Sequence, residues 1–148
     1  MQPPELTKYV HEHIPLSKAM GVSVVAVEDH AVLVQAPLEP NLNHQRTVFG
    51  GSASAVAILA SWALLHVRLR SAGFTDDLVI QRNIMEYQHP ILGHFTARSM
   101  LERPEDWKPF TAMLARRGKA RITVVAVLEY MGRVAGRFSG DFVARGGP

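Results

Sequence analysis

The sequence predicts an α+β domain in which an antiparallel sheet of about six strands wraps around one long central helix. Residues 53–70 contain no glycine or proline and are small or apolar around most of the helix circumference. This pattern is typical of a helix enclosed by other structure. The remaining apolar runs are short, rich in β-branched residues and separated by turn residues, which is typical of strands joined as hairpins.

Each expected element follows from its local pattern. A short helix over residues 5–14 should end before Pro15. A second short helix lies within residues 104–117 and is ended by Gly118. We expect three hairpins, one of them joining its strands through the proline and glycine of residues 89–93. The predicted strands are residues 22–27, 31–36, 78–88, 94–101, 120–131 and 133–144.

The segment before the central helix has the composition of a loop that approaches another group closely. Residues 37–49, PLEPNLNHQRTVF, contain two prolines and two asparagines. Gly50 and Gly51 end this loop, and Ser52 suits the N-cap or the first turn of the helix. The junction between loop and helix is therefore the first place to look for a site.

Composition excludes several classes of protein. The 148 residues suit a single domain, 1–148, and no repeat or low-complexity run is present. The absence of cysteine removes disulfides and thiol chemistry, which is compatible with a cytoplasmic location. The N-terminal residues do not have the pattern of a signal peptide. The most apolar window, residues 53–65, is too short for a membrane span, so none is expected.

Basic residues cluster at two places although the net charge is only +3. Positive surface of this kind attracts phosphates, and a solvated cationic face without a ligand is the alternative. No aromatic residues alternate with these basic residues as they do on a nucleic-acid platform, so nucleic acid is not an expected partner. The clusters are Arg68 with Arg70, and Arg116, Arg117, Lys119 and Arg121.

Three segments carry a resemblance to a known family. These are NHQRTVFGGSASA at residues 43–55, EYQHPILGHF at residues 86–95 and GKARITVVAVL at residues 118–128. Together they resemble the putative thioesterase domain that in some proteins follows a GNAT acetyltransferase. The resemblance covers nearly the whole chain. It implies a hot-dog fold and an enzyme, a hydrolase of acyl thioesters such as acyl-CoA.

The same resemblance points to residues for catalysis. Related hot-dog thioesterases carry an asparagine and, six residues later, a histidine followed by two glycines. Asn43, Gly50 and Gly51 fall at matching places, whereas Phe49 stands at the histidine position. A glycine amide at a helix N-terminus can polarise a thioester carbonyl, because the first N–H groups of a helix have no partner within the helix. The resemblance implies that Asn43 orients water or substrate.

The expected general base is not at its usual place. Many of these enzymes carry an acid about two turns into the central helix, but no acid lies between Gly51 and Arg70. His44, beside Asn43, is the candidate base because the pKa of a histidine side chain is ordinarily near neutrality. A loop histidine that hydrogen-bonds the turn or faces water is the alternative for this residue.

Other polar residues are candidates for substrate binding. Ser52 and Ser54 could orient water, with packing as their alternative role. Asn83 could face a pocket from its strand, or could face solvent instead. By resemblance, coenzyme A phosphates would lie near Gly118. The basic candidates flanking this glycine are Arg117 and Lys119, and a solvent-facing turn is their alternative role. The spacing of the histidines does not indicate a metal site, and no cofactor is expected.

Three functions fit these sequence features and the resemblance. The first is hydrolysis of an acyl thioester carried by coenzyme A or acyl carrier protein. A hydroxyacyl-thioester dehydratase shares the fold but needs a histidine and acid pair that the central motif lacks. A non-catalytic acyl-CoA binding module is favoured by the missing helix acid. By analogy the chain is expected to form a homodimer or a dimer of dimers, which would also cover the edges of its long strands.

Overall fold

The computed structural model describes residues 1–75 and 77–146. Its helices are α1 (Pro3–His13), α2 (Pro15–Ala19), α3 (Gly50–Ser71) and α4 (Trp107–Arg117), with 3-10 turns at Glu39–Asn41 and Pro104–Asp106. Its strands are β1 (Ser23–Val27), β2 (Val32–Ala36), β3 (Asp77–Tyr87), β4 (Phe95–Leu101), β5 (Lys119–Tyr130) and β6 (Arg133–Arg145).

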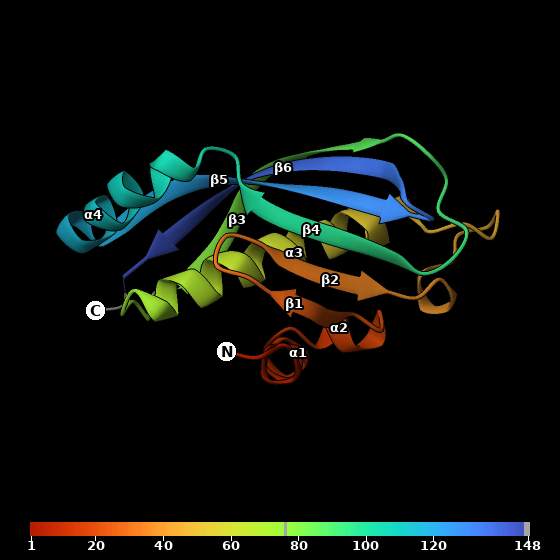
Figure 1. Cartoon of the computed structure of the whole chain (residues 1–148), viewed down its shortest axis with the longest axis horizontal. Helices are drawn as coiled ribbons and strands as arrows, with labels where there is room; N and C mark the ends of the chain where they lie inside the picture. The colour runs from red at the N-terminus through yellow and green to blue at the C-terminus, as the bar shows by residue number, and fades with distance from the viewer. Residues whose placement is uncertain (76, 147–148) are drawn as a thin grey trace.

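The six strands form one antiparallel sheet in the order β1-β2-β4-β5-β6-β3. The sheet curls around α3, and α1 packs along β1 at one edge (Figure 1). At the other edge, β3 pairs with β6 on one side only. This is the predicted hot-dog arrangement, and its count of strands and its central helix are confirmed.

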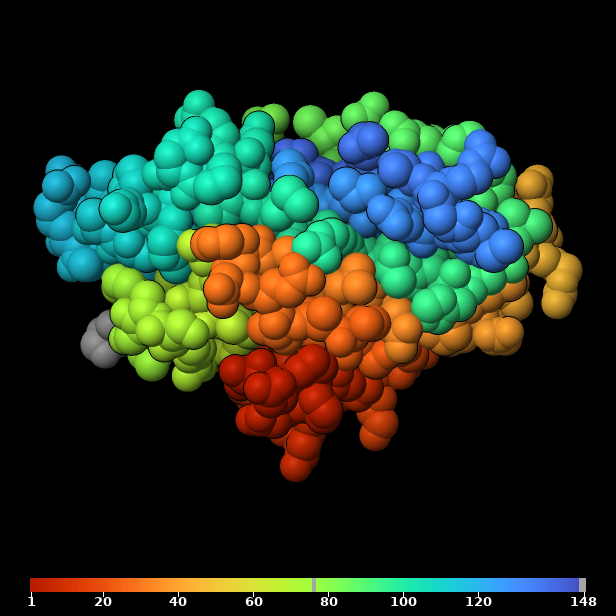
Figure 2. All heavy atoms as spheres, in the orientation of Figure 1, coloured from red at the N-terminus to blue at the C-terminus, as the bar shows by residue number. Residues whose placement is uncertain are grey.

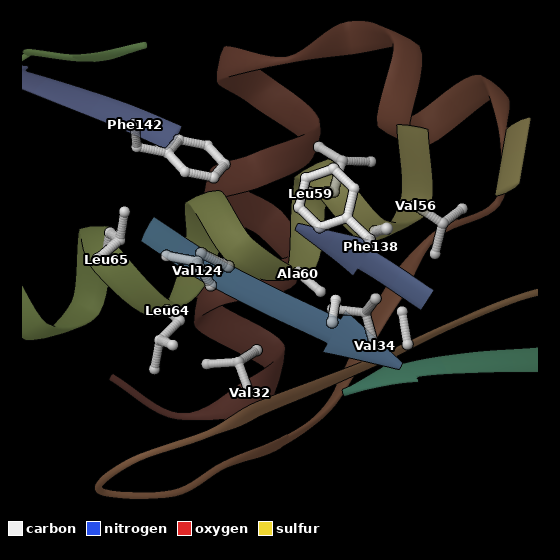
Figure 3. Packing of buried hydrophobic residues seen from close by; sticks show 14 of the residues in the cluster. Val32, Val34, Val56, Leu59, Ala60, Leu64, Leu65, Val124, Phe138 and Phe142 are labelled. Atoms are coloured by element: carbon white, nitrogen blue, oxygen red, sulfur yellow. The ribbon is translucent and has the colours of Figure 1, made fainter. Parts of the chain in front are cut away.

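The core forms where the inner face of the sheet meets α3. Leu64 and Leu65 of the helix are fully buried, and Val124, Phe138 and Phe142 of the long C-terminal strands lie over the same helix (Figure 3). Side chains on β5 and β6 alternate between this buried face and the outer face, as the pleat requires. The helix therefore has a sheet against most of its circumference.

A buried hydroxyl fixes α3 to the sheet. Ser99 of β4 is fully buried, and its Oγ lies 2.7 Å from the carbonyl oxygen of Ala60 and 3.3 Å from that of Val32. The bond to Ala60 joins helix to strand across the core, and the hydroxyl proton is shared between two backbone acceptors. A buried hydroxyl that is hydrogen-bonded sets one position of the helix along the sheet, because any slip would leave it without a partner.

The predicted hairpin between residues 78–88 and 94–101 is wrong. These residues do form strands β3 and β4, but β3 pairs with β6, while β4 lies between β2 and β5. The connection of seven residues, 88–94, crosses three strand spacings, about 14 Å. Seven extended residues reach about 23 Å. Proline and glycine in this stretch indicated a turn, but the connection is long enough to cross the end of the sheet instead.

The start of the central helix also differs from the expectation. Gly50 and Gly51 do not end the loop, because α3 begins at Gly50 with Phe49 as its N-cap. Ser52 therefore lies in the first turn, one of its two predicted positions. At the N-terminus the chain forms a further short helix, α2, because Pro15 ends α1 but suits the first turn of a new helix. The other two hairpins and the αL cap at Gly118 are confirmed.

The apolar segment of α3 is longer than the window predicted from the sequence, residues 53–65. By length and composition alone, this helix could cross a membrane. Most of its apolar window is buried within the domain. That burial is typical of the core helix of a soluble α+β domain.

The enclosure of α3 predicts a large cost for truncating its core side chains. Leu64→Ala should lower the free energy of unfolding by about 2–5 kcal/mol, because it removes a fully buried side chain and leaves a cavity. Leu92→Ala is the matched control, since Leu92 is 56% exposed in the 88–94 connection, and its effect should stay within about 0.5 kcal/mol. Urea unfolding measures both, and equal losses would contradict the assigned core.

Candidate functional site

The loop before α3 is held by backbone and side-chain hydrogen bonds. The N–H of Phe49 donates to the carbonyl oxygen of Asn41, and the N–H of Val48 donates to that of Ile91 in the 88–94 connection. Asn41 is itself buried, with its amide nitrogen donating to the carbonyl oxygens of Met20 and Pro37. These bonds fix the point at which the helix begins.

Asn43 organises the turn inside this loop. Its Oδ1 accepts from the N–H groups of Gln45 and Thr47, and its Nδ2 donates to Thr47 Oγ1 at 2.8 Å. The turn also holds Arg46 at a φ of 65°. All these side-chain bonds lie within residues 43–47, so Asn43 shapes the loop that leads to Gly50. Its predicted role toward water or substrate stays a prediction.

The first turn of α3 carries unpaired donors and begins beside a pocket. Within the part of the chain that the structure describes, no acceptor bonds the N–H groups of Gly50, Gly51 and Ser52. A cavity of about 340 Å³ lies beside Gly50, and Tyr87 and His89 line it as well. Unpaired N–H groups at a helix N-terminus carry positive potential, so this pocket suits an oxygen that bears partial negative charge.

Two aromatic rings frame these glycines. Tyr87, at the end of β3, donates its hydroxyl to the carbonyl oxygen of Gly50 at 3.0 Å. A Cβ on Gly50 would lie 3.4 Å from the Tyr87 ring, whereas a Cβ on Gly51 would lie 2.5 Å from the ring of Phe49. Phe49, at the expected histidine position, therefore covers Gly51 with an apolar ring. Glycine at position 51 allows that close approach.

The two histidines near this pocket are placed differently. His44 is exposed in the 43–47 turn and does not line the pocket. His89 follows β3 and lines the pocket together with Gly50, and its Nε2 lies 3.4 Å from a guanidinium nitrogen of Arg133. His89 is not among the site residues that the sequence predicts. The signal that could have found it is the segment EYQHP, which resembles the family as clearly as the glycine motif does.

Asn83 lies on the face of β3 that points toward the helix. Arg82 is directed to the outer face, where its Nε lies 3.6 Å from Asp141. Because successive residues of a strand point to opposite faces, Asn83 shares the inner face with Met85 and Tyr87. Its side chain is exposed. Along β3, Asn83 thus lies between the pocket at Gly50, lined by Met85 and Tyr87, and another cavity at the start of the strand.

The basic candidates lie at the other end of the molecule. Lys119 at the start of β5 lies opposite Arg145, and Arg145 lies opposite Asp77 at the start of β3. Gly50, in contrast, contacts Tyr87 at the other end of β3. β3 spans about 33 Å. Figure 2 shows the same separation, with α4 at one end and the loop before α3 at the other. A single chain does not bring Arg117, Gly118 and Lys119 to the helix N-terminus.

The two serines of α3 are half-buried. Ser52 and Ser54 lie in the first turn and a half of the helix, close to the free N–H groups. Neither serine lines the pocket beside Gly50, and their role toward a ligand stays a prediction. Among the residues that the structure describes, no group of three histidine, aspartate or glutamate side chains is arranged to hold a metal ion.

A second cavity, of about 640 Å³, lies between α1, α2, α3 and the start of β3. Four of its residues form stacked rings: Tyr9 and His13 of α1 at 3.8 Å between centroids, Tyr9 and His66 at 4.5 Å, and Trp62 and His66 at 4.8 Å. We call these four residues the aromatic column. Most of the other lining side chains are apolar, among them Ile58, Leu59, Leu69 and Phe142.

His66 is the buried polar group of the aromatic column. It is 7% exposed, and its Nε2 has no hydrogen-bond partner among the described residues. Burial, and to a smaller extent the charges of Arg70 and His13, lower the pKa of His66 to about 4. The imidazole is therefore uncharged at neutral pH and can either donate or accept one hydrogen bond at Nε2.

The family described as "Putative thioesterase (yiiD_Cterm)" matches residues 4–146. The chain belongs to this family. Its glycine motif and its 88–94 connection therefore both fall inside the matched region of a putative thioesterase domain.

Solved structures share the fold of this thioesterase-family domain. A protein of unknown function from Chlorobaculum tepidum TLS has a TM-score of 0.91 at 24% identity, with 99% of this chain and 98% of that chain covered. A putative thioesterase from Shewanella oneidensis has a TM-score of 0.82 at 23% identity, with 96% of each chain covered. A thioesterase from Haemophilus influenzae has a TM-score of 0.79 at 10% identity, with 99% and 92% covered.

The buried histidine makes the stability of this family member depend on pH. Between pH 6.5 and pH 4 the unfolded chain binds a proton at His66 that the folded chain does not, so the free energy of unfolding rises with pH there. The contribution of this residue is up to about 3 kcal/mol and is lost as the pH falls to 4.

His66→Phe keeps a ring in the aromatic column and removes the titration, so this variant should lose less stability than the wild type between pH 6.5 and pH 4. His30→Phe is the matched control at an exposed histidine and should retain the wild-type slope. Urea unfolding at a series of pH values measures both. A slope that His66→Phe leaves unchanged would show that His66 is not the group responsible.

Proposed function

We propose that this protein hydrolyses an acyl thioester whose carrier is coenzyme A or acyl carrier protein. The observation that carries the proposal is the set of free N–H groups of Gly50, Gly51 and Ser52 at the start of α3, where Gly50 lines the pocket. Such donors can stabilise the oxyanion that forms when water attacks a thioester carbonyl. Membership of the thioesterase family supports the same reaction.

The proposed reaction needs few groups. The thioester carbonyl oxygen accepts from the Gly50 and Gly51 amides, and a water molecule attacks the carbonyl carbon while a base takes its proton. The C–S bond then breaks, and the thiolate takes the proton from the base as the acid leaves. Tyr87, bonded to the carbonyl oxygen of Gly50, keeps the first turn of α3 in place for this sequence. One base and one oxyanion site are sufficient for this chemistry.

Two residues compete for the role of base. His89 lines the pocket with Gly50, which places an imidazole beside the proposed carbonyl position. His44 is exposed two residues before Arg46 and would reach the substrate from the loop side. We favour His89 because a base must come within hydrogen-bonding distance of the attacking water, directly or through one further water. Asn43 contributes by holding the loop, and its own contact with water belongs to the same proposal.

The proposed site uses two copies of the chain. The free edge of β3 is eleven residues long and carries exposed Val79, Ile84 and Tyr87, which is the kind of edge that pairs with another strand. Antiparallel pairing of two β3 edges would set the basic end of one subunit beside the helix N-terminus of its partner. Arg117, Gly118 and Lys119 would then lie where the phosphates of coenzyme A could reach them, with Asn83 near the junction.

A second candidate function is supported by one feature of α3. The helix carries no acid, and Ala57, Ile58 and Leu59 occupy the region where many hot-dog thioesterases place one. An acyl-CoA binding module without turnover needs no base and would tolerate this sequence. A dehydratase would need a histidine and acid pair at this motif and is less well supported. A cytoplasmic location is part of the proposal, and the lack of cysteine is compatible with it.

Thiol release from short, medium, long and aromatic acyl-CoAs tests the proposal. Gly50→Val should lower kcat/KM for the best substrate by about 10²-fold or more, because its methyl groups would crowd the Tyr87 ring and shield the amides. His89→Ala should lower kcat by about 10²-fold or more if it is the base, and more than His44→Ala does. His30→Ala, at an exposed histidine far from this motif in sequence, is the matched control.

Circular dichroism and urea unfolding confirm that each variant is folded before its rate is interpreted. Gly50→Ala serves as the milder variant, since its Cβ meets Tyr87 at an ordinary contact distance. Wild-type turnover by Gly50→Val would refute the oxyanion site. Acyl-CoA binding without hydrolysis of any substrate would favour the binding module.

Sedimentation equilibrium tests the proposed pairing of subunits. The wild type should sediment at twice the mass of the chain or a multiple of that, because pairing satisfies the free edge of β3. Ile84→Glu introduces a charge at a side chain that is 58% exposed on β3, and this variant should dissociate at higher concentrations than the wild type does. A monomeric wild type would rule out a site shared between two copies.

A further inference from the structure

One row of residues on α3 leads from Gly51, next to the proposed carbonyl site, to the larger cavity. Gly51, Ala55, Ile58, Trp62 and His66 follow one another at intervals of three or four residues, so they lie along the same side of the helix. The last four of these residues line the 640 Å³ cavity. From Gly51 to His66 the row measures about 22 Å along the helix axis. We call this row of residues the α3 stripe.

The walls of the cavity suit an apolar ligand. The residues near the start of the α3 stripe are small, Gly51 and Ala55, and the row then includes the larger side chains of Ile58 and Trp62. Leu78 and Ile80 of β3 lie on the opposite wall, and α1 contributes Tyr9. A volume of about 640 Å³ lies within the usual range for small-molecule pockets.

One polar atom deep in the cavity is left without a hydrogen bond. Nε2 of His66 is buried and lacks a partner among the described residues, although His66 lines this cavity. Buried polar atoms in proteins nearly always have a partner, so an atom of this kind in a ligand-sized cavity indicates where a ligand group would bond. Trp62, its neighbour in the aromatic column, already uses its indole N–H to bond the carbonyl oxygen of Leu78 at 3.3 Å.

The charges around His66 favour an uncharged ligand group. Arg70 and Asp77, which carry opposite charges, both line the cavity and are both exposed. From α1, Tyr9 stacks on the imidazole of His66, and His13 stacks on Tyr9. His66 itself is neutral because its pKa is lowered to about 4. A hydroxyl or carbonyl group can bond a neutral imidazole without bringing a charge into an apolar cavity.

We propose that the cavity along the α3 stripe holds the acyl group of the substrate and that His66 Nε2 hydrogen-bonds an uncharged polar group, such as a hydroxyl, at the distal end of that acyl group. The proposal rests on the proposed thioester hydrolysis for the identity of the ligand. Its physical basis is the row of α3 residues that lines the cavity from Ala55 to His66, the apolar walls and the unpartnered imidazole nitrogen. The preferred substrate class is then a long acyl chain with a terminal hydroxyl.

The geometry favours a ligand over a second copy of the chain as the occupant. The cavity is bounded by α1 and α2, by α3 and by the start of β3. A second copy would add to the free hydrogen-bonding edge of β3, which lies at the rim of the cavity. His66 is buried, so it lies too deep for the backbone of an added strand to bond it.

Binding can be measured without turnover by using Trp62 as a reporter. The chain has two tryptophans, and Trp107 on α4 does not line the cavity. Trp107→Phe therefore leaves Trp62 as the one source of tryptophan fluorescence. The probes are 1-octanol, 1-chlorooctane of similar length without a hydroxyl, and octanoate as an anion, each titrated into the protein in its native oligomeric state at neutral pH.

In the Trp107→Phe background, 1-octanol should bind about 3- to 10-fold more tightly than 1-chlorooctane, the effect of one neutral hydrogen bond. Adding His66→Phe keeps the stacked ring and should abolish this preference, whereas His30→Phe at an exposed histidine should retain it. Three results would each overturn the proposal: no change in Trp62 fluorescence with any probe, equal affinity for both neutral probes, or tighter binding of octanoate than of 1-octanol.

Turnover then links the cavity to the reaction. Octanoyl-, dodecanoyl- and hexadecanoyl-CoA are compared with their ω-hydroxy forms, and the ratio of kcat/KM for the hydroxylated to the plain chain should be greatest at one of the longer lengths. His66→Phe should lower that ratio by about 3- to 10-fold. If no thioester is hydrolysed while the octanol preference holds, the proposed function fails and the cavity assignment stands. A ratio unchanged by His66→Phe would separate the cavity from the substrate.

Discussion

The enclosure of α3 by the sheet is the constraint on which the rest of the structure depends. A helix of 22 residues with no charge before Arg68 is stable in water only when other structure covers it. The sheet covers most of its circumference, and the bond from Ser99 to the carbonyl oxygen of Ala60 sets its position along the strands. Because the helix is fixed in this way, its N-terminus and its uncovered side lie at defined places.

Both cavities follow from that constraint. The sheet closes on all of α3 except the gap between α1 and β3, so the polar end of the helix and one row of its side chains remain accessible to ligands. The 88–94 connection and the loop before α3 are tied together by the bond between Val48 and Ile91, which brings His89 and Gly50 to one pocket. Two segments about forty residues apart in sequence are joined in this way.

The architecture could be predicted from the sequence because local patterns determine it. The uniform apolarity of the central helix and the alternation along residues 120–144 indicated burial correctly. The pairing of β3 could not be predicted in the same way, since Pro90 and Gly93 are compatible with both a tight turn and a crossing. Pairing between β3 and β6 is a contact between residues far apart in sequence, and no local pattern encodes it.

The candidate site was predictable only in part for the same reason. Gly50 and Gly51 could be found because a motif of adjacent residues marks them. Tyr87 and His89 reach that motif through the fold, and the unpartnered nitrogen of His66 becomes evident only when its surroundings are known. In sequence, His66 is one more residue of an apolar helix.

The arrangement of α3 has a consequence for how such a protein can diversify. One side of the helix packs into the core, and the α3 stripe lies on another side, with the two sets interleaved along the same 22 residues. Substitutions on the stripe would reshape the cavity, whereas substitutions of core side chains such as Leu64 would disturb the packing beneath the sheet. One helix thus carries both the residues needed for folding and the residues that shape the cavity. Related proteins can therefore change their ligand through substitutions on one side of this helix.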